Sequence, residues 1–429
     1  GKSGDTVQIT KVPVQKLSAE IQKSLNEKPD SEISRINYKK DSTNIVSVYR
    51  VQKADGVIST SKTAVEISLG LIGIMTLFMG FMSIAEKAGG INFLSRMIQP
   101  FFSKLFPEIP KNHPSFGHMT LNFAANLLGL DNAATPFGLK AMESLQSLNP
   151  DKDRASNAQI MFLCLHASGL TLIPVSIIAI RASMDSATPT DIFLPTMIAT
   201  FCATMAAMII VSFKQKINLF QSTLLAFIGG VSALIAILVW YLVKLNKEEL
   251  DNASKFISNG MILLIFFAII AGAVYKKINV FDAFIDGAKE GFNVCVKIIP
   301  YLVGMLIAIS LLRTSGVFDV IIDGMKYVAQ IANLDTRFVD GLPTALIKPL
   351  SGSGARGMMV DTMTTFGVDS FPARLSGILQ GSSDTTFYVI AVYFGAVGIK
   401  NTRYTVGAML LADLVGITVS ILMAYLFFG

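Results

Sequence analysis

Two clusters of polar residues interrupt apolar stretches that are otherwise long enough to cross a membrane. Their polar members are His166, Ser168 and Thr171 in the first cluster and Gln380, Ser382, Ser383, Asp384 and Thr385 in the second. A carboxylate inside a bilayer is costly unless it faces a partner, water or a ligand. Hydroxyls that bond to carbonyls one turn earlier explain one or two of these residues, but not Asp384 beside its polar neighbours. The clusters favour a site for a polar solute, although a lone membrane histidine such as His166 is as often a hydrogen-bond partner between helices.

Two glycine-bearing stretches, Leu121–Leu139 and Pro343–Met363, are too short to span a membrane. They predict re-entrant hairpins, which lipid permits only where protein or water surrounds the backbone. Their small polar and charged residues are Asp131, Asn132 and Thr135 in the first stretch and Ser351, Ser353 and Arg356 in the second. A helix N-terminus at such a position favours an anionic group, and Arg356 is suited to pair with Asp384 or with an anionic solute. The alternative to a solute site is that these glycines only allow the two hairpins to pack tightly.

The composition excludes several classes of protein. Of the 429 residues, 52% are hydrophobic and 15% are charged, whereas soluble domains carry about 25% charged residues. The net charge of +6 comes without a basic cluster, so we expect no nucleic acid polymer as a partner. The three cysteines lie in apolar stretches without a CxxC pair, which argues against a disulfide or a zinc site. No catalytic triad or carboxylate pair occurs, so we expect no enzyme and no cofactor, while a coupling cation (Na⁺ or a proton) stays open.

The apolar stretches predict a mainly α-helical, multi-pass membrane protein. A span needs roughly 20 apolar residues, because about 30 Å of hydrocarbon is crossed at 1.5 Å per residue. Five stretches meet this test well, namely Ala64–Ala85, Ile192–Phe213, Leu219–Val243, Ile257–Tyr275 and Tyr404–Phe428. Three contain Gly, Pro or polar residues and meet it less well, namely Ala158–Ile180, Phe292–Leu312 and Ser376–Ala396. The expected partners are membrane lipid, a small-molecule solute and further copies of the chain in a homo-oligomer.

The first 60 residues differ from the rest in being polar and charged. Short runs typical of strands occur at Val7–Thr10, Ile45–Val51 and Val57-Ile58, and helical spacing occurs at Leu17, Ile21 and Leu25. We therefore expect a small α+β segment, or a loosely ordered arm, outside the bilayer.

The sequence predicts that the membrane part consists of two repeats. Ser61–Gly89 aligns without gaps with Ala288–Gly316, and an amphipathic stretch and a glycine-bearing hairpin follow in both halves. Leu165–Ala182 then aligns with Leu379–Ala396, with five identities. The predicted units are an arm (1–60), a first repeat (61–213), a connecting helix pair (214–280) and a second repeat (281–429).

Five spans between the starts of the repeats would give the halves opposite orientations, as in secondary transporters. Six basic residues then fall on one side, namely Lys214, Lys216, Lys276, Lys277, Lys400 and Arg403. The excess of positive charge assigns that side to the cytoplasm and the N-terminal arm to the other side. This count requires a further helix before Gly1.

Long motifs resemble a known pair of proteins. NLLGLDNAATPFGLKAMESL and SGLTLIPVSIIAIR resemble spore maturation protein A, and LIKPLSGSGARGM and QGSSDTTFYVIAVYFGAVGIK resemble spore maturation protein B. The chain is thus similar to a fusion of the two, in the nucleoside recognition or Gate class, which also resembles concentrative nucleoside transporters and the membrane part of ferrous-iron transporters. The resemblance implies two hairpins and two broken helices that form a transport region held by a scaffold. It implies site residues Asn126, Asp131, Asn132, Thr135, Ser168, Thr171, Ser351, Ser353, Gln380, Ser382, Asp384 and Thr385.

Three functions stay open. The leading hypothesis is a carrier that moves a small polar or anionic solute across the bacterial inner membrane. An elevator-like motion of its hairpin region against the scaffold would provide alternating access. The second is a membrane assembly partner of envelope proteins, with the arm as its docking module. The third is a metal-ion pore that uses Cys164, His166 and Asp384.

Overall fold

The computed structural model describes residues 6–13, 32–33, 36–40, 45–52, 56–110, 112–128, 131–315 and 317–429. Among these residues, six helices are long and apolar enough to cross a membrane. They are α2 (Gly56–Lys87), α8 (Phe193–Gln215), α9 (Ser222–Val243), α10 (Lys247–Tyr275), α11 (Val280–Thr314) and α17 (Thr405–Phe428). The five stretches expected to span well are confirmed as helices, and so is Phe292–Leu312, because α11 continues through Pro300. The chain is a multi-pass membrane protein.

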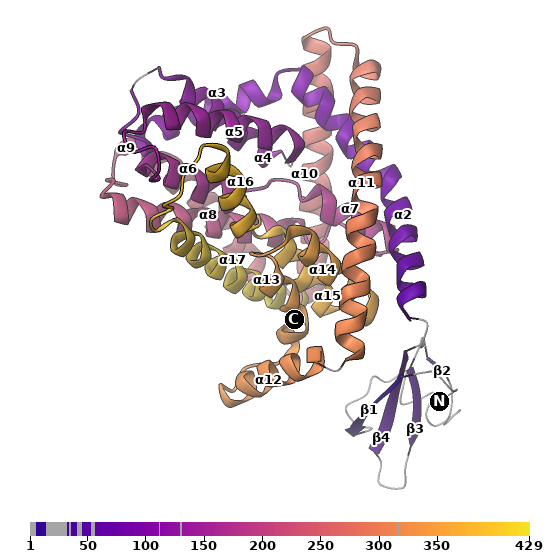
Figure 1. Cartoon of the computed structure of the whole chain (residues 1–429). Coiled ribbons are helices and arrows are strands. Elements are labelled where there is room, and N and C mark those ends of the chain that lie inside the picture. The colour runs from indigo at the N-terminus through magenta and orange to yellow at the C-terminus, as the bar shows by residue number, and fades with distance from the viewer. Residues whose placement is uncertain are drawn as a thin grey trace.

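The N-terminal segment contains a four-stranded antiparallel sheet (Figure 1). Its strands are β1 (Thr6–Pro13), β2 (Glu32–Ile33), β3 (Ile36–Lys40) and β4 (Ile45–Gln52), in the order β1-β4-β3-β2. Two of the strand predictions are confirmed, and the predicted helix around Leu17–Leu25 lies outside the described residues. The prediction of a strand at Val57-Ile58 is wrong, since α2 already begins at Gly56. A short apolar run does not distinguish a strand from the first turn of a helix.

Helices α2 and α11 form an antiparallel pair at one side of the molecule (Figure 1). A Cβ atom at Gly291 would lie 2.7 Å from Met75 O, and one at Gly287 would collide with Met79 O. These two glycines, four residues apart, let the two backbones approach closely, as small residues do between membrane helices.

The two halves share one order of elements. After α2 and α11 come the amphipathic helices α3 (Gly90–Leu105) and α12 (Val317–Ile331), which lie at opposite ends of that pair (Figure 1). A helix pair follows in each half, α4 (Pro114–Leu127) with α5 (Asp131–Leu148), and α13 (Pro343–Ile347) with α14 (Gly352–Phe366), the latter preceded by the 3₁₀ helix η2 (Arg337–Gly341). The last span of each half, α8 or α17, is preceded by a helix broken in the middle.

Both breaks occur at the predicted polar clusters. Helix α6 (Asn157–Ala167) ends and α7 (Val175–Ser183) begins around the first cluster, and α15 (Phe371–Gly381) and α16 (Thr386–Ala396) flank the second. Ala158–Ile180 and Ser376–Ala396 are therefore broken helices, not continuous spans.

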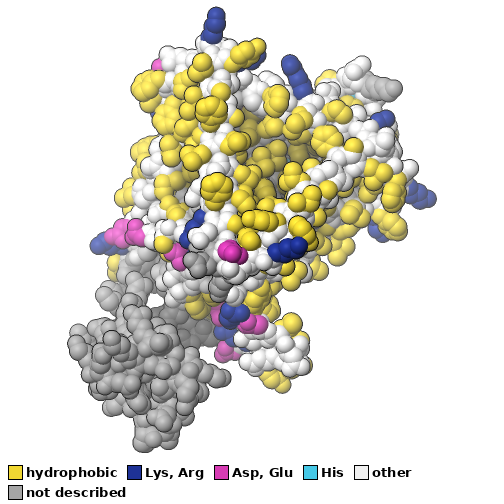
Figure 2. Space-filling model, turned by 180° about the vertical axis from the view of Figure 1, so that it is seen from behind, with side chains coloured by type: hydrophobic (Ala, Val, Ile, Leu, Met, Phe, Trp, Pro, Cys, Tyr) yellow, Lys and Arg dark blue, Asp and Glu magenta, His cyan; other side chains and the backbone are white. Residues whose placement is uncertain are grey.

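Much of the described surface is apolar, as a membrane environment requires. Figure 2 shows apolar side chains over most of one face, with charged side chains mainly along its lower edge and at isolated points of the rim. On α9 and α10, Leu234, Ile237 and Phe267 are each at least 65% exposed. In contrast, α8 is largely buried and contacts α17, so the polar breaks lie next to the most buried span.

Candidate functional site

The two helix breaks meet in the interior. The backbone N–H of Asp384 donates to Ala167 O at 2.7 Å, and a Cβ atom at Gly169 would lie 3.5 Å from Asp384 N. Gly169 has φ +61°, a left-handed conformation that glycine adopts without steric cost. This conformation lets the segment after α6 turn away from the axis of that helix while it contacts the second break.

Each break is also tied to the helix pair of its own half. Leu172 N donates to Leu127 O, at the end of α4, and Phe387 N donates to Pro349 O, between α13 and α14, both at 2.9 Å. Backbone groups freed by a broken helix must find partners inside a membrane protein. The two halves satisfy this need in the same way, so the breaks and the two helix pairs form one connected body.

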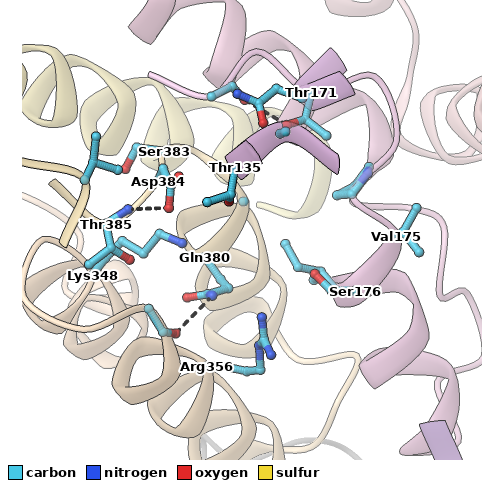
Figure 3. Close-up of a pocket in the computed structure, with 18 of the residues that line it drawn as sticks. Thr135, Thr171, Val175, Ser176, Lys348, Arg356, Gln380, Ser383, Asp384 and Thr385 are labelled. Atoms are coloured by element: carbon cyan, nitrogen blue, oxygen red, sulfur yellow. Dashed lines mark hydrogen bonds between the residues drawn. The ribbon is translucent and has the colours of Figure 1, made fainter. Parts of the chain in front are cut away.

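A cavity of about 310 Å³ lies where these elements converge (Figure 3), a size at the small end for small-molecule sites. Its polar lining residues are Asn126, Thr135, His166, Thr171, Ser176, Lys348, Arg356, Gln380, Ser383, Asp384, Thr385, Tyr388 and Tyr393. The α2/α11 pair contributes only Met75, Met79 and Val294 to the lining. One wall of the cavity is therefore apolar, and the polar groups come from the breaks and helix pairs.

Four helices begin at this cavity. Ala134 in the first turn of α5, Val175 at the start of α7, Gly352 at the start of α14 and Thr385 at the N-cap of α16 all line it. A helix N-terminus carries unpaired N–H groups and a partial positive charge. Lys348 and Arg356 add two cationic side chains, against the single carboxylate of Asp384 in the lining. The electrostatics of the cavity thus favour an anionic group.

His166 is held in one orientation by its neighbours. Its ring is 4% exposed, and its Nδ1 lies 2.7 Å from Asn126 Nδ2 and 3.1 Å from Asn122 Oδ1. The other nitrogen, Nε2, lies 3.9 Å from Asp384 Oδ2. Asn122 is in turn fixed by donating to Ala134 O at 2.7 Å. His166 thus connects α4 of the first half with the break of the second.

The structure brings most of the predicted site residues to the cavity. Nine of them line it, namely Asn126, Thr135, His166, Thr171, Arg356, Gln380, Ser383, Asp384 and Thr385. The side chains of Asp131 and Asn132 lie outside the described residues.

Four predicted residues are placed elsewhere. Ser168 and Ser382 are buried at the ends of α6 and α15, where each hydroxyl donates at 2.9 Å to a carbonyl three residues earlier. This is the local bonding that hydroxyls often make in membrane helices. Ser351 caps α14 by accepting from Gly354 N at 3.0 Å, and Ser353 contacts Ser351. These hydroxyls shape the helix ends and do not line the cavity.

Sequence reasoning missed several residues. Lys348 lines the cavity although it lies just before the predicted glycine cluster. Asp413 on α17 is 6% exposed and accepts from Thr386 Oγ1 at 2.5 Å, directly behind the second break. A carboxylate within an apolar span is itself a functional signal, and it could have pointed to Asp413.

An ion-pair cluster joins the halves away from the cavity. Arg181, at the end of α7, contacts Asp191 at 3.0 Å and Asp369 at 2.9 Å, and Arg374 on α15 contacts Asp191 at 2.8 Å. Burial alone would raise the pKa of Asp369. Hydrogen bonds from Ser186 and from Ala187 N, together with the two guanidinium groups, outweigh burial and lower that pKa below its usual value.

A cavity formed by two broken helices and two helix pairs, inside a bundle of apolar spans, defines a multi-pass membrane protein with a buried polar site. The sequence comparison agrees with this class, because residues 68–184 and 295–400 match the Gate family, described as "Nucleoside recognition". The chain belongs to this family and contains its domain in two copies.

Two curated relatives cover separate halves of the chain. Spore maturation protein A of Bacillus subtilis (strain 168) is 45% identical over 156 residues, which are 36% of this chain and 80% of that protein. Spore maturation protein B of the same strain is 44% identical over 175 residues, which are 41% of this chain and 97% of that protein. The resemblance to a fusion of the two is confirmed. No solved structure matches the chain.

Proposed function

We propose that the protein is a carrier that moves a small anionic solute across the membrane. The observation that carries this proposal is the convergence of four helix N-termini with Lys348 and Arg356 on one cavity. Helix N-termini stabilise anions with oriented backbone N–H groups, and guanidinium groups bind carboxylate or phosphate through two parallel hydrogen bonds. Asp384 and the hydroxyls of Thr171, Ser176 and Thr385 would orient the rest of the solute.

The architecture supports alternating access. We propose that the halves are inserted in opposite orientations, which is supported by the antiparallel α2 and α11 and by the placement of α3 and α12 at opposite ends of this pair (Figure 1). Met75, Met79 and Val294 form the cavity wall on that pair. A polar body that slides along an apolar wall breaks no hydrogen bonds to it, so the breaks and helix pairs can move as a unit against α2 and α11. Carriers with inverted repeats alternate access by moving one part of the protein against another.

The two other hypotheses have less support. Among the described residues, no three His, Cys, Asp or Glu side chains gather as ligands for a metal ion. Lys348 and Arg356 would also repel a metal cation from His166 and Asp384. An assembly role for the N-terminal segment predicts that its deletion abolishes function while substitutions in the cavity have no effect.

Uptake into proteoliposomes tests the proposal. The full chain would be reconstituted and supplied with radiolabelled succinate, malate, lactate, aspartate and glycerol phosphate, each against protein-free vesicles. At least one anion should accumulate, and Arg356→Met and Lys348→Met should each reduce its uptake about tenfold or more. Lys400→Met is the matched control, because Lys400 is 79% exposed and pairs with Asp153 away from the cavity. Uptake that is absent for every anion, or unchanged in both cavity variants, would refute the proposal.

A further inference from the structure

One nitrogen of the His166 ring has no hydrogen-bond partner among the described residues. The ring is 4% exposed, and its two hydrogen-bond contacts, to Asn126 and Asn122, both involve Nδ1. The other nitrogen, Nε2, is not among the sealed side-chain atoms that lack a hydrogen bond, so it keeps accessible surface where His166 lines the cavity. Nε2 lies 3.9 Å from Oδ2 of Asp384, whose side chain is 47% exposed and lines the cavity beside Thr385 (Figure 3). An open ring nitrogen that faces a carboxylate is a position at which a proton can bind.

The groups around Nδ1 suit the ring in both of its protonation states. Asn122 donates through Nδ2 to Ala134 O at 2.7 Å, so its Oδ1, an acceptor, is the end that faces Nδ1 at 3.1 Å. Asn126 Nδ2, a donor, lies 2.7 Å from the same ring nitrogen. Nδ1 accepts from Asn126 when it is unprotonated and donates to Asn122 when it is protonated, and the Asn126 amide can then turn its oxygen to the ring. The ring can therefore gain a proton without losing its partner at Nδ1.

Asp384 is the acidic side chain that responds to the charge of this ring. Helices α4, α5, α8, α16 and α17 pack against α6. Helix α16 places the ring of Tyr393 edge-on against the imidazole, with 4.8 Å between the ring centroids, and α17 carries Asp413, which binds Thr386 behind the second break. Among the described side chains, Asp384 is the carboxylate within ion-pair distance of the imidazole. Protonation of His166 thus creates an ion pair with Asp384, inside a protein environment where charges interact more strongly than in water.

We propose that His166 and Asp384 bind a proton that crosses the membrane together with the anionic solute. This inference rests on the proposed function and makes the carrier a proton–anion symporter. The proton forms a bond to a nitrogen of the neutral ring, which becomes a cation paired with Asp384, and the same bond breaks when the proton leaves on the other side of the membrane. The charged ring adds to the positive charges of Lys348 and Arg356 in the same cavity, so proton and anion each strengthen the binding of the other. The proton also cancels one negative charge of the solute, which lowers the electrical work of moving it across the membrane.

The number of protons taken up with each anion tests this inference. Isothermal titration calorimetry on the full chain in detergent micelles would measure this number at about pH 7.5, where an ordinary histidine is mostly neutral, by comparing binding heats in two buffers of different ionisation enthalpy. The probes are the five anions of the uptake assay, each corrected for its own ionisation. About 0.3 proton or more should enter with each bound anion, because a neutral histidine becomes charged.

Two histidine variants locate the proton. His166→Gln should bring the number of protons below about 0.1 per anion. His118→Gln is the matched control and should preserve the number, because the ring of His118 contacts Ser144 at 2.9 Å and does not line the cavity.

The outcomes separate this inference from the proposed function. Anion binding without proton uptake overturns the inference and leaves the carrier proposal standing. Proton uptake that persists in folded His166→Gln assigns the proton to another group and also overturns the inference. If none of the five anions binds, the proposed function fails and the inference fails with it.

A second measurement decides the matter if His166→Gln does not fold. The chain contains three histidines, so in the double variant His113→Gln with His118→Gln the ¹⁵N NMR signals of histidine come from His166 alone. These signals should change from those of a neutral to those of a charged imidazole when the anion is added. Signals that stay unchanged with the anion bound would overturn the inference.

Discussion

Replacing Arg181 by Met should destabilise the fold by about 3 kcal/mol. Removing one partner of a buried ion pair costs about 3–5 kcal/mol, because the other charge stays buried without compensation. Arg181 is fully buried and Asp191 is 3% exposed, so the substitution removes charge where water cannot replace it. Asp191 keeps Arg374 at 2.8 Å, and Asp369 is 31% exposed, which places the effect at the lower end of that range. Methionine preserves the apolar stem of the side chain, so the loss reports mainly on charge and hydrogen bonds.

Equilibrium unfolding in detergent micelles titrated with SDS would measure this effect. The matched control is Lys400→Met, which breaks the exposed pair with Asp153 and should change the free energy of unfolding by less than about 1 kcal/mol. The double variant Arg181→Met with Asp191→Asn should recover part of the loss, because it removes one of the two carboxylates that are left to share Arg374. Equal free energies for Arg181→Met and Lys400→Met would contradict the structural role assigned to the cluster.

Three further predictions concern the pH response, the helix pair and the buried hydroxyls. The pKa of Asp369 is lowered below its usual 3.8, so the stability that this carboxylate contributes is present above pH 3.8 and is lost as the pH falls through the lowered pKa. Asp369→Asn should therefore flatten the acid limb of a profile of stability against pH. An unchanged acid limb would show that Asp369 is not the group whose protonation destabilises the fold. Gly291→Val should lower the free energy of unfolding by about 1–3 kcal/mol, because the new side chain overpacks against the backbone of Met75. Gly260→Val is the control, since the space around its Cβ position is open. Equal unfolding midpoints for the two variants would contradict the tight contact between α2 and α11. Ser168→Ala should lower stability by about 1 kcal/mol yet leave anion affinity unchanged in calorimetry, since its hydroxyl bonds to Leu165 O; a large loss of affinity would place it in the site.

The spans and the breaks could be read from the sequence because both are local properties. The hydrophobicity of about 20 consecutive residues decides whether a helix can cross a bilayer, and the polar residues from His166 to Thr171 and from Gln380 to Thr385 mark where such a helix cannot continue. The repeat alignment paired these two segments, and the structure brings them into contact through Asp384 N and Ala167 O. The start of α2 was mispredicted because Val57 and Ile58 form too short a run to reveal its period.

Which polar residue faces the cavity was decided only by the tertiary structure. Successive residues near a helix end point in directions about 100° apart, so Ser382 bonds to its own helix while its neighbour Ser383 lines the cavity. The convergence of four helix N-termini, the approach of Lys348 and the pairing of Arg181 with Asp369 join residues far apart in the chain. The sequence by itself determined a membrane protein with two broken helices, since the hydrophobicity of a span and the polar residues that interrupt it are both properties of consecutive residues. The packing of those helices against one another determined which charged and polar side chains line the cavity, because this depends on the rotation of each helix about its axis.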